Sequence, residues 1–390
     1  MRAAAFLYPW DVAGDPGAAA RTADLGVQQV TLAAAYHSTR ALTPRHPRHR
    51  VVTAEHAAVL YEPGARWDGR ELRPYPAGEW APGDSYGEAA HALAEAGLDV
   101  HTWVVLAHNS RLGAEHPHTA VVNAYGDRYP WAPCIAQPAT RAYLVALAAE
   151  AAVRPGARGT ELESCGWYGL AHLHAHDKTA GVDVGEAGQY LMSLCFCADC
   201  RAGYARHGLD PDGLAVRVRG ALEPVWQGEE PTEGWAGVEK LLGDGTAAAT
   251  RAWREEAART LQEECVAAVR AAAPEDFQVL LHADPLTYRC GANAGVDPEH
   301  ILSVADGVVV PCTGGTRALE PFAAQGRGVV AANFTVVSGM GGSPAALARD
   351  AARAAELGAG ELRLYHAGLA SDTDLALVRA ALRETLSRPE

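Results

Sequence analysis

Two acidic residues stand one alternation apart in the short segment 159–164, which reads Gly-Thr-Glu-Leu-Glu-Ser. Residues two apart in a β-strand point to the same face, so Glu161 and Glu163 lie side by side if this segment is a strand. Burial or a neighbouring carboxylate raises the pKa of such a group into the range that a general acid needs. We therefore predict Glu163, the nearer to the strand end, as general acid/base. Glu161 is either a second polar group of the site or half of an ion pair with an arginine in the fold.

Three of the eight cysteines fall within six residues, at Cys195, Cys197 and Cys200. Thiolates at this spacing converge on one tetrahedral Zn²⁺, and a closed structural site needs a fourth ligand from elsewhere in the chain. A redox-active C-x-x-C pair is the alternative, although no thioredoxin-like context surrounds it. We predict a structural zinc that joins the surrounding insertion to the rest of the fold.

Polar and aromatic residues gather where apolar segments end. Burying such groups without partners costs about 1–3 kcal/mol each, so we expect them to line a cavity. Aromatic rings beside carboxylates and amides suit a sugar, with Trp10, Trp131 and Trp167 as stacking platforms or as ordinary core residues. The predicted substrate-binding residues are Trp10, Asp11, His37, His108, Asn109, Glu161, Trp167, His172, His174, His282, Asn333 and Tyr365.

Histidines alternate at His172, His174 and His176. On an extended segment they point to one side, where they can bind a metal or sugar hydroxyls. A solvated loop is the third interpretation. Their spacing is not the i, i+4 pattern of a helical zinc site.

The elements that position these residues follow a repeating pattern of a short apolar run and then a helical segment. Such repetition indicates parallel strands joined by helices, and eight strands close a (β/α)8 TIM barrel. An open doubly wound sheet would show the same pattern, but no run is followed by a G-x-G-x-x-G turn. We predict one barrel domain over 1–390, with insertions after strands 2 and 4 at about 39–85 and 165–246. The eight runs are 3–8, 27–36, 100–107, 159–164, 277–282, 307–310, 328–337 and 361–365.

The charge balance excludes some classes of partner. The 390 residues include 47 acidic and 33 basic ones, a formal charge of -14. Nucleic acids and anionic membranes need clustered Lys and Arg, so we expect neither as a partner. No apolar run reaches the length of a membrane span, and we expect a cytoplasmic protein. The basic loop at 45–50 is most simply a solvated insertion or a contact in a homo-oligomer.

Two segments carry a resemblance to a known family. Cys195 to Tyr204 reads C-F-C-A-D-C-R-A-G-Y, and 127–141 reads D-R-Y-P-W-A-P-C-I-A-Q-P-A-T-R. Both resemble segments of the family 42 glycoside hydrolases, zinc-containing β-galactosidases with a TIM barrel. The resemblance covers roughly 125–205. It implies a zinc site of Cys134, Cys195, Cys197 and Cys200, with Glu163 as the acid/base that ends the fourth strand.

The chain also departs from that family. Leu162 stands where the family has an Asn, and Asn333 stands about where its nucleophilic Glu ends the seventh strand. A retaining mechanism needs two carboxyls about 5–5.5 Å apart, whereas an inverting one tolerates about 6.5–9.5 Å. Asp284, Asp11 or Glu320 would have to supply the second group.

The sequence therefore predicts an enzyme that cleaves a small glycoside, with Glu163 donating a proton and Asp284 as base or nucleophile. One alternative is a non-catalytic barrel that binds carbohydrate. The other is a metal-dependent lyase or isomerase that uses the histidine run.

Overall fold

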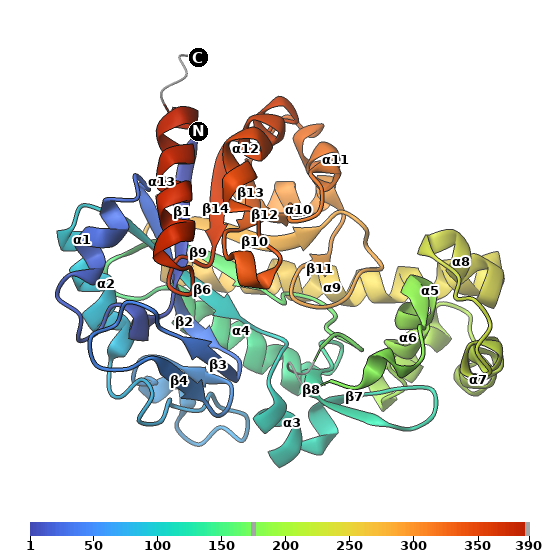
Figure 1. Ribbon diagram of the computed structural model, residues 1–390. Coiled ribbons are helices and arrows are strands. Elements are labelled where there is room, and N and C mark those ends of the chain that lie inside the picture. The colour runs from blue at the N-terminus through green and yellow to red at the C-terminus, as the bar shows by residue number, and fades with distance from the viewer. Residues whose placement is uncertain (173–176, 387–390) are drawn as a thin grey trace.

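The computed structural model describes residues 1–172 and 177–386 and contains a closed barrel of parallel strands (Figure 1). Each barrel strand pairs with the next one along the chain, and β1 closes the ring by pairing with both β2 and β14. The predicted TIM barrel is confirmed, and the open sheet is excluded. The eight strands are β1 (Arg2–Leu7), β2 (Gln29–Tyr36), β6 (Asp99–Val105), β9 (Ala157–Glu163), β10 (Gln278–Asp284), β12 (Gly307–Pro311), β13 (Val329–Thr335) and β14 (Glu361–Tyr365).

One helix follows each strand and covers the outside of the barrel, as the alternating pattern predicts. The apolar outward residues of the strands pack against these helices and form the main core. The helices are α1 (Ala18–Ala23), α2 (Ser85–Glu95), α4 (Pro138–Ala152), α9 (Asp244–Ala272), α10 (Pro298–Val304), α11 (Glu320–Ala323), α12 (Leu347–Glu356) and α13 (Asp372–Leu386).

The strand pleat separates two environments. Leu162 is fully buried in the main core outside the barrel, so its neighbours Glu161 and Glu163 point into the lumen. Leu280, Val309 and Ala331 form a small apolar cluster of their own. Leu280 pairs with Glu161 and Val309 pairs with His282, so this cluster lies at the same levels of the barrel as the polar residues.

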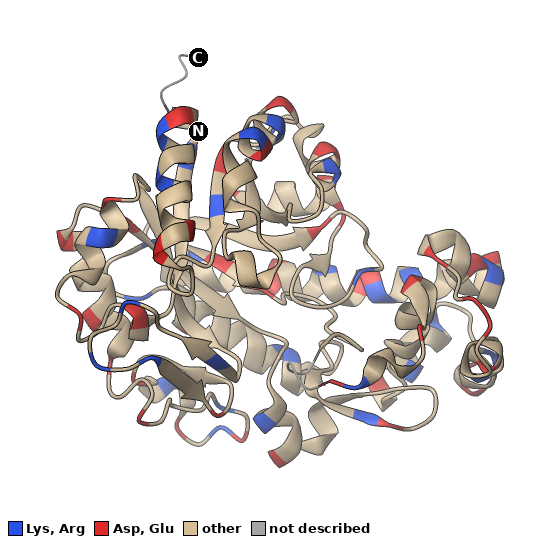
Figure 2. Cartoon of the chain, in the orientation of Figure 1, with Lys and Arg blue, Asp and Glu red and all other residues tan. Residues whose placement is uncertain are grey.

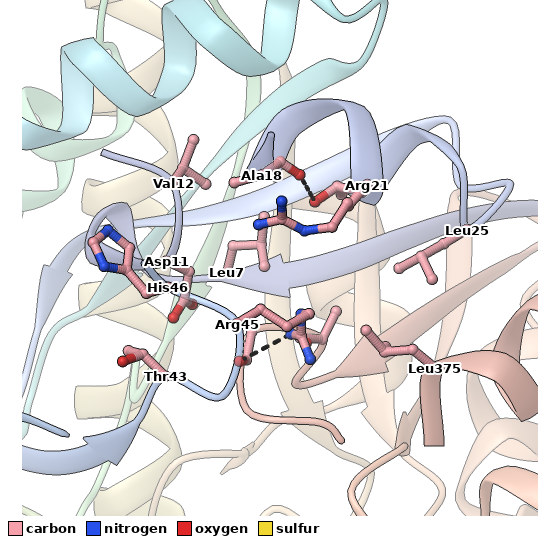
Figure 3. Close-up of a pocket in the computed structure, with 13 residues that line it drawn as sticks. Leu7, Asp11, Val12, Ala18, Arg21, Leu25, Thr43, Arg45, His46 and Leu375 are labelled. Atoms are coloured by element: carbon pink, nitrogen blue, oxygen red, sulfur yellow. Dashed lines mark hydrogen bonds between the residues drawn. The ribbon is translucent and has the colours of Figure 1, made fainter. Parts of the chain in front are cut away.

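The insertion after β2 contains β3 (Thr39–Leu42), β4 (Val51–Ala54) and β5 (Ala58–Val59). Its basic loop is not simply solvated, because the Arg45 guanidinium donates hydrogen bonds to the carbonyls of Ala367, Gly368 and Ala370. His46 is only 3% exposed and lines the same small cavity as Arg45 and Ala367 (Figure 3). The loop ties the first insertion to the segment after β14.

Between β6 and α4 the sequence pattern was irregular, yet this part of the chain is ordered into helix and hairpin. It contains α3 (Ser110–Glu115), β7 (Ala120–Val122) and β8 (Arg128–Pro133). The short strands of the hairpin carry too few residues for a clear alternation.

The insertion after β9 forms a group of helices beside the barrel mouth (Figure 1). It contains α5 (Gly185–Met192), α6 (Ala198–Arg206), α7 (Pro211–Trp226) and α8 (Gly234–Leu242). In the view of Figure 2, the Lys and Arg residues of these helices lie among Asp and Glu. In the two described ranges, no helix has both the length and the apolar content for crossing a membrane.

Candidate active site and cysteine cluster

The lower carboxylate of the lumen, Glu161, belongs to a buried ion pair. Arg363 Nε lies 2.5 Å from Glu161 Oε1, and the Thr31 hydroxyl donates to the same oxygen at 3.0 Å. Both members of the pair are 0% exposed. Burial alone would raise the pKa of Glu161, but the Arg363 guanidinium and then His282 outweigh burial and lower it to about 2. Glu161 is thus ionised and closed off from solvent, which favours the alternative of an ion pair with an arginine; its contact with substrate stays a prediction.

The upper carboxylate, Glu163, lies in a different environment. Its side chain is 11% exposed, and its Oε2 accepts a hydrogen bond of 2.7 Å from the indole N–H of Trp103. Burial raises the pKa of Glu163 above its ordinary value, and His282 and the Trp103 N–H offset this only in part. A carboxyl with a raised pKa and an opening to solvent can hold a proton and deliver it to a ligand.

His282 lies between the two carboxylates. Its Nε2 is 3.4 Å from Glu161 Oε2, and its Nδ1 is 3.9 Å from Glu163 Oε2. The imidazole is level with Glu163 across β9 and β10, because Leu281 pairs with Leu162. The side chain of His282 is 4% exposed and lies against both glutamates, and its contact with substrate stays a prediction.

Aromatic rings surround Glu163 at the top of the lumen. Trp103 packs edge-on against Phe6 and Tyr36, with ring centroids 4.8 and 4.6 Å apart. Burial raises the pKa values of Tyr36 and of Tyr365, so both phenols stay protonated. Tyr365 ends β14, is half-buried and remains a candidate substrate contact.

Two predicted stacking platforms are core residues instead. Trp10 is 2% exposed and stacks on Tyr8 with centroids 4.5 Å apart. Trp167 is 4% exposed, and its N–H donates to the Arg254 carbonyl at 2.9 Å. Tertiary packing covers both rings, which the sequence cannot show.

Two predicted polar contacts also have structural partners. Asn109 Oδ1 accepts the Leu112 N–H at 2.9 Å and caps α3. Asp11 lines a cavity of only about 30 Å³ with Arg45 and His46 (Figure 3), too small for a sugar. Burial raises the pKa of Asp11 to about 7.

Three of the predicted histidines come together at the mouth. The ring of His108 lies 4.5 Å from that of His37 and 5.7 Å from that of His172. Burial lowers the pKa of His37 to about 4, so it is neutral near pH 7. His174 and His176 lie outside the described residues, so the histidine run stays a prediction.

A large cavity opens beside this group, between the barrel rim and the second insertion. Its volume is about 1070 Å³. Asp284 and Pro311, which end β10 and β12, line it together with His172. Asp284 Oδ1 accepts the Leu286 N–H at 2.8 Å, and burial raises the pKa of Asp284. Asn333 ends up half-buried in β13, and its Oδ1 has no hydrogen-bond partner among the described residues.

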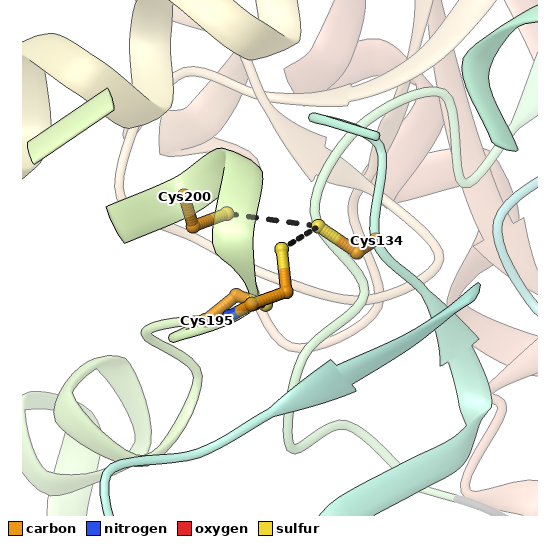
Figure 4. A group of neighbouring side chains, drawn as sticks. Cys134, Cys195 and Cys200 are labelled. Carbon is orange, nitrogen blue, oxygen red and sulfur yellow. Dashed lines mark hydrogen bonds between the residues drawn. The ribbon is translucent and has the colours of Figure 1, made fainter. Parts of the chain in front are cut away.

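The four predicted cysteines converge (Figure 4). Their sulfurs lie within 4.8 Å of one another, and Cys134 Sγ is 3.7 Å from Cys197 Sγ and 3.6 Å from Cys200 Sγ. Tetrahedral zinc with bonds of about 2.3 Å would hold its sulfurs roughly 3.8 Å apart. A covalent disulfide would need about 2.05 Å. The set therefore fits a metal ion, and the redox pair is disfavoured because four sulfurs converge rather than two.

The surroundings of the cluster agree with thiolate ligands. Cys195 Sγ accepts N–H groups from Val122 and from Cys197, each at 3.5 Å. Cys197 is the N-cap of α6, so the positive end of that helix points toward the sulfurs. The two N–H groups and the N-terminus of α6 thus stabilise negative charge on the sulfurs.

Sequence reasoning missed three residues of this region: Trp103, Arg363 and Trp226. Arg363 carried a usable signal, since it is the charged residue in the middle of the apolar run 361–365. Trp103 follows His101 at strand spacing, which places it in the lumen. Trp226 ends α7 in the second insertion and lines the large cavity, which only tertiary structure reveals.

Comparison with known proteins yields likeness of fold alone. No family model matches the chain, and no curated protein does. Among solved structures, an α-L-fucosidase isoenzyme 2 from Paenibacillus thiaminolyticus has a TM-score of 0.59 at 13% identity, covering 99% of this chain and 50% of that one. A β-galactosidase from Marinomonas ef1 has a TM-score of 0.57 at 10% identity, covering 99% and 60%.

The PgaB (BpsB) glycoside hydrolase domain from Bordetella bronchiseptica has a TM-score of 0.57 at 15% identity. The alignment covers 100% of this chain and 100% of that domain. This chain therefore spans about half of the fucosidase and 60% of the galactosidase, but the whole of the third domain. The resemblance to family 42 stays an expectation. What the chain shares with all three is a barrel used by glycoside hydrolases.

Proposed function

We propose that the protein is a glycoside hydrolase in which Glu163 is the general acid/base. The observation that carries the proposal is the state of this carboxyl. It ends the fourth barrel strand, its pKa is raised by burial, and part of it stays open to solvent. The C-terminal ends of the strands are where TIM barrels place their chemistry. Likeness in fold to glycoside hydrolases supports the same class of substrate.

Asp284 is our candidate for the second carboxylate, acting as general base. It lies one pleat above His282, which is level with Glu163 on the neighbouring strand. Strand spacing and rise put the Cα atoms of Glu163 and Asp284 roughly 8 Å apart. We propose an inverting mechanism for this pair, in which the two carboxyl groups would stand about 6.5–9.5 Å apart. In this scheme Asp284 takes a proton from water while Glu163 protonates the leaving oxygen.

A non-catalytic barrel that binds carbohydrate is the second candidate, and Asn333 favours it. An amide stands about where family 42, which two segments of the chain resemble, carries its nucleophile, so a retaining route through β13 is closed. The two candidates differ in whether any glycosidic bond is broken.

Hydrolysis of an aryl-glycoside panel separates them. We expect turnover on at least one member, a loss of about 10²–10⁴-fold in Asp284→Asn, and a loss in Glu163→Gln that grows as the leaving group becomes poorer. Proton NMR of the first product should show the inverted anomer. Absence of turnover across the panel would favour the binding protein. A retained anomer would remove Asp284 from the role of base.

We further propose that the four cysteines hold a structural Zn²⁺. Cys134 follows β8, whereas the other three lie between α5 and the first turn of α6 in the helical insertion, so the ion would join the two segments. A closed four-thiolate site leaves no open position for substrate, so the ion would supply stability rather than chemistry.

A further inference from the structure

We propose that the large cavity binds an oligosaccharide chain, with Trp226 of the second insertion as its distal stacking platform. The inference rests on the proposed function and extends it, because the sequence alone predicted a small glycoside. Trp226 was not among the tryptophans that the sequence singled out.

The extent of the cavity is the first argument. It begins at Asp284 and Pro311 on the barrel rim, passes Gln189 and Met192 of α5, and reaches Trp226 at the end of α7. Its volume of about 1070 Å³ lies at the top of the range of about 300–1,000 Å³ that holds a drug-sized ligand. A single sugar ring would leave most of this space filled with water.

The state of Trp226 is the second argument. Its side chain lines the cavity, and the residue is 38% exposed, in contrast to Trp10 and Trp167. Its indole N–H donates to the Tyr125 hydroxyl at 2.7 Å, and the two ring centroids are 6.3 Å apart at 67°. This bond satisfies the polar edge of the indole and fixes the ring, leaving an apolar surface for the C–H face of a sugar.

The third argument is how the platform is held. Tyr125 belongs to the turn between β7 and β8, and Arg219 of α7 donates to the carbonyl of the adjacent Ala124 at 2.7 Å. The β7–β8 turn and α7, which are far apart in sequence, therefore hold the Tyr125–Trp226 pair together. A rigid support of this kind lowers the cost of ordering a binding surface.

Charge in the cavity restricts the sugar. Asp183 and Asp284 line it, whereas the lining Arg289 pairs with Glu186. Carboxylate oxygens accept hydroxyl hydrogens but repel a uronate or a sulfate. We therefore expect an oligosaccharide of neutral or amino sugars.

Binding to the Glu163→Gln variant tests the inference without turnover. The probes are glucose, galactose, N-acetylglucosamine and glucosamine, each as the monomer and as the hexamer, together with a galacturonate hexamer. Calorimetry measures the affinity for each probe. At least one hexamer should bind more tightly than its monomer. Adding Trp226→Ala should weaken that hexamer about tenfold while changing monomer affinity less than twofold.

Two further variants act as controls. Trp226→Phe keeps an aromatic face and should retain most of the hexamer affinity. Val216→Ala alters an exposed residue of the same helix and should change nothing. The inference is overturned if no hexamer binds better than its monomer, if Trp226→Ala leaves the hexamer affinity intact, or if the galacturonate hexamer binds equally well. These outcomes are independent of hydrolysis, so loss of the proposed catalysis would leave them readable.

Discussion

The polar residues around Glu161 in the barrel lumen and the four cysteines of the cluster are both buried. The negative charge of these two groups is offset in different ways. In the lumen the chain supplies its own counter-charge, since Arg363 neutralises Glu161 at 2.5 Å. The four cysteines have backbone N–H groups and a helix N-terminus nearby, but within residues 1–172 and 177–386 no cationic side chain forms a hydrogen bond with their sulfurs. The lumen contains its own counter-charge, whereas the geometry of the four cysteines could hold a metal ion.

The lumen contains a second contrast between its own two levels. Glu161 has a guanidinium, a hydroxyl and an imidazole around it, whereas Glu163 has one indole N–H and a more distant imidazole. Two glutamates of one strand therefore differ in their pKa. Glu161 is held ionised, whereas the pKa of Glu163, two residues later, is raised toward the protonated form. Chemistry is expected where the balance is incomplete and solvent can enter.

The largest effect should come from the cysteine cluster. Cys197→Ser removes one of four ligands, and we expect a loss of stability on the order of 5 kcal/mol, a fraction of the 10–16 kcal/mol typical of structural zinc binding. Metal analysis of the purified wild-type protein should give one zinc per chain. Cys265→Ser, at a buried cysteine outside the cluster, is the matched control. A Cys197→Ser variant with full zinc and full thermal stability would contradict the proposed site.

Removing the counter-charge of the lumen should have the next largest effect. Arg363→Met leaves Glu161 buried without its cation, which should lower the free energy of unfolding by about 3–5 kcal/mol. The double variant Arg363→Met with Glu161→Gln should recover much of this loss. Urea denaturation at pH 7 measures both. A single variant as stable as wild type would show that Glu161 does not depend on Arg363.

The pH dependence of stability follows from the same pair. The pKa of Glu161 is lowered from 4.5 to about 2 in the folded state, so its stabilising contribution is present above pH 4.5 and disappears as the pH falls toward 2. The contribution amounts to about 3 kcal/mol. We expect wild type to lose that much more stability than the double variant between pH 5 and pH 2. Parallel curves for the two proteins would refute the ionised pair.

The smallest effect concerns the hydrogen bond to Glu163. Trp103→Phe removes an N–H that favours the charged carboxylate, so the pKa of Glu163 should rise further. The alkaline limb of kcat/KM should then move up by about one pH unit. Trp67→Phe is the control, because its N–H donates to Glu150 at 2.6 Å far from the lumen. A shift to lower pH in Trp103→Phe would reverse our assignment of the bond.

Much of the barrel could be predicted from the sequence, because buried parallel strands read as short apolar runs between helices. The alternation around Leu162 was enough to place Glu161 and Glu163 in the lumen. The pairing of Glu161 with Arg363 was out of reach, since 202 residues separate them and only barrel closure brings them together.

The aromatic residues show what the sequence could not predict. Trp10 and Trp167 carry the residue type of a sugar platform, but burial decides whether a ring is available, and burial depends on packing from distant elements. Trp226 is a candidate only because the fold brings the end of α7 and the rim at Asp284 to one cavity. Spacing identified the cysteine cluster because three of its ligands are local in sequence.

The dependence of hydrolysis on the leaving group tests the role of Glu163 most directly. A general acid matters little for a good leaving group, such as dinitrophenol, and greatly for a poor one, such as methanol. On any sugar that the protein hydrolyses, we predict that Glu163→Gln slows the poor leaving group by at least about 10²-fold more than the good one. Equal slowing of both substrates would contradict proton donation by Glu163.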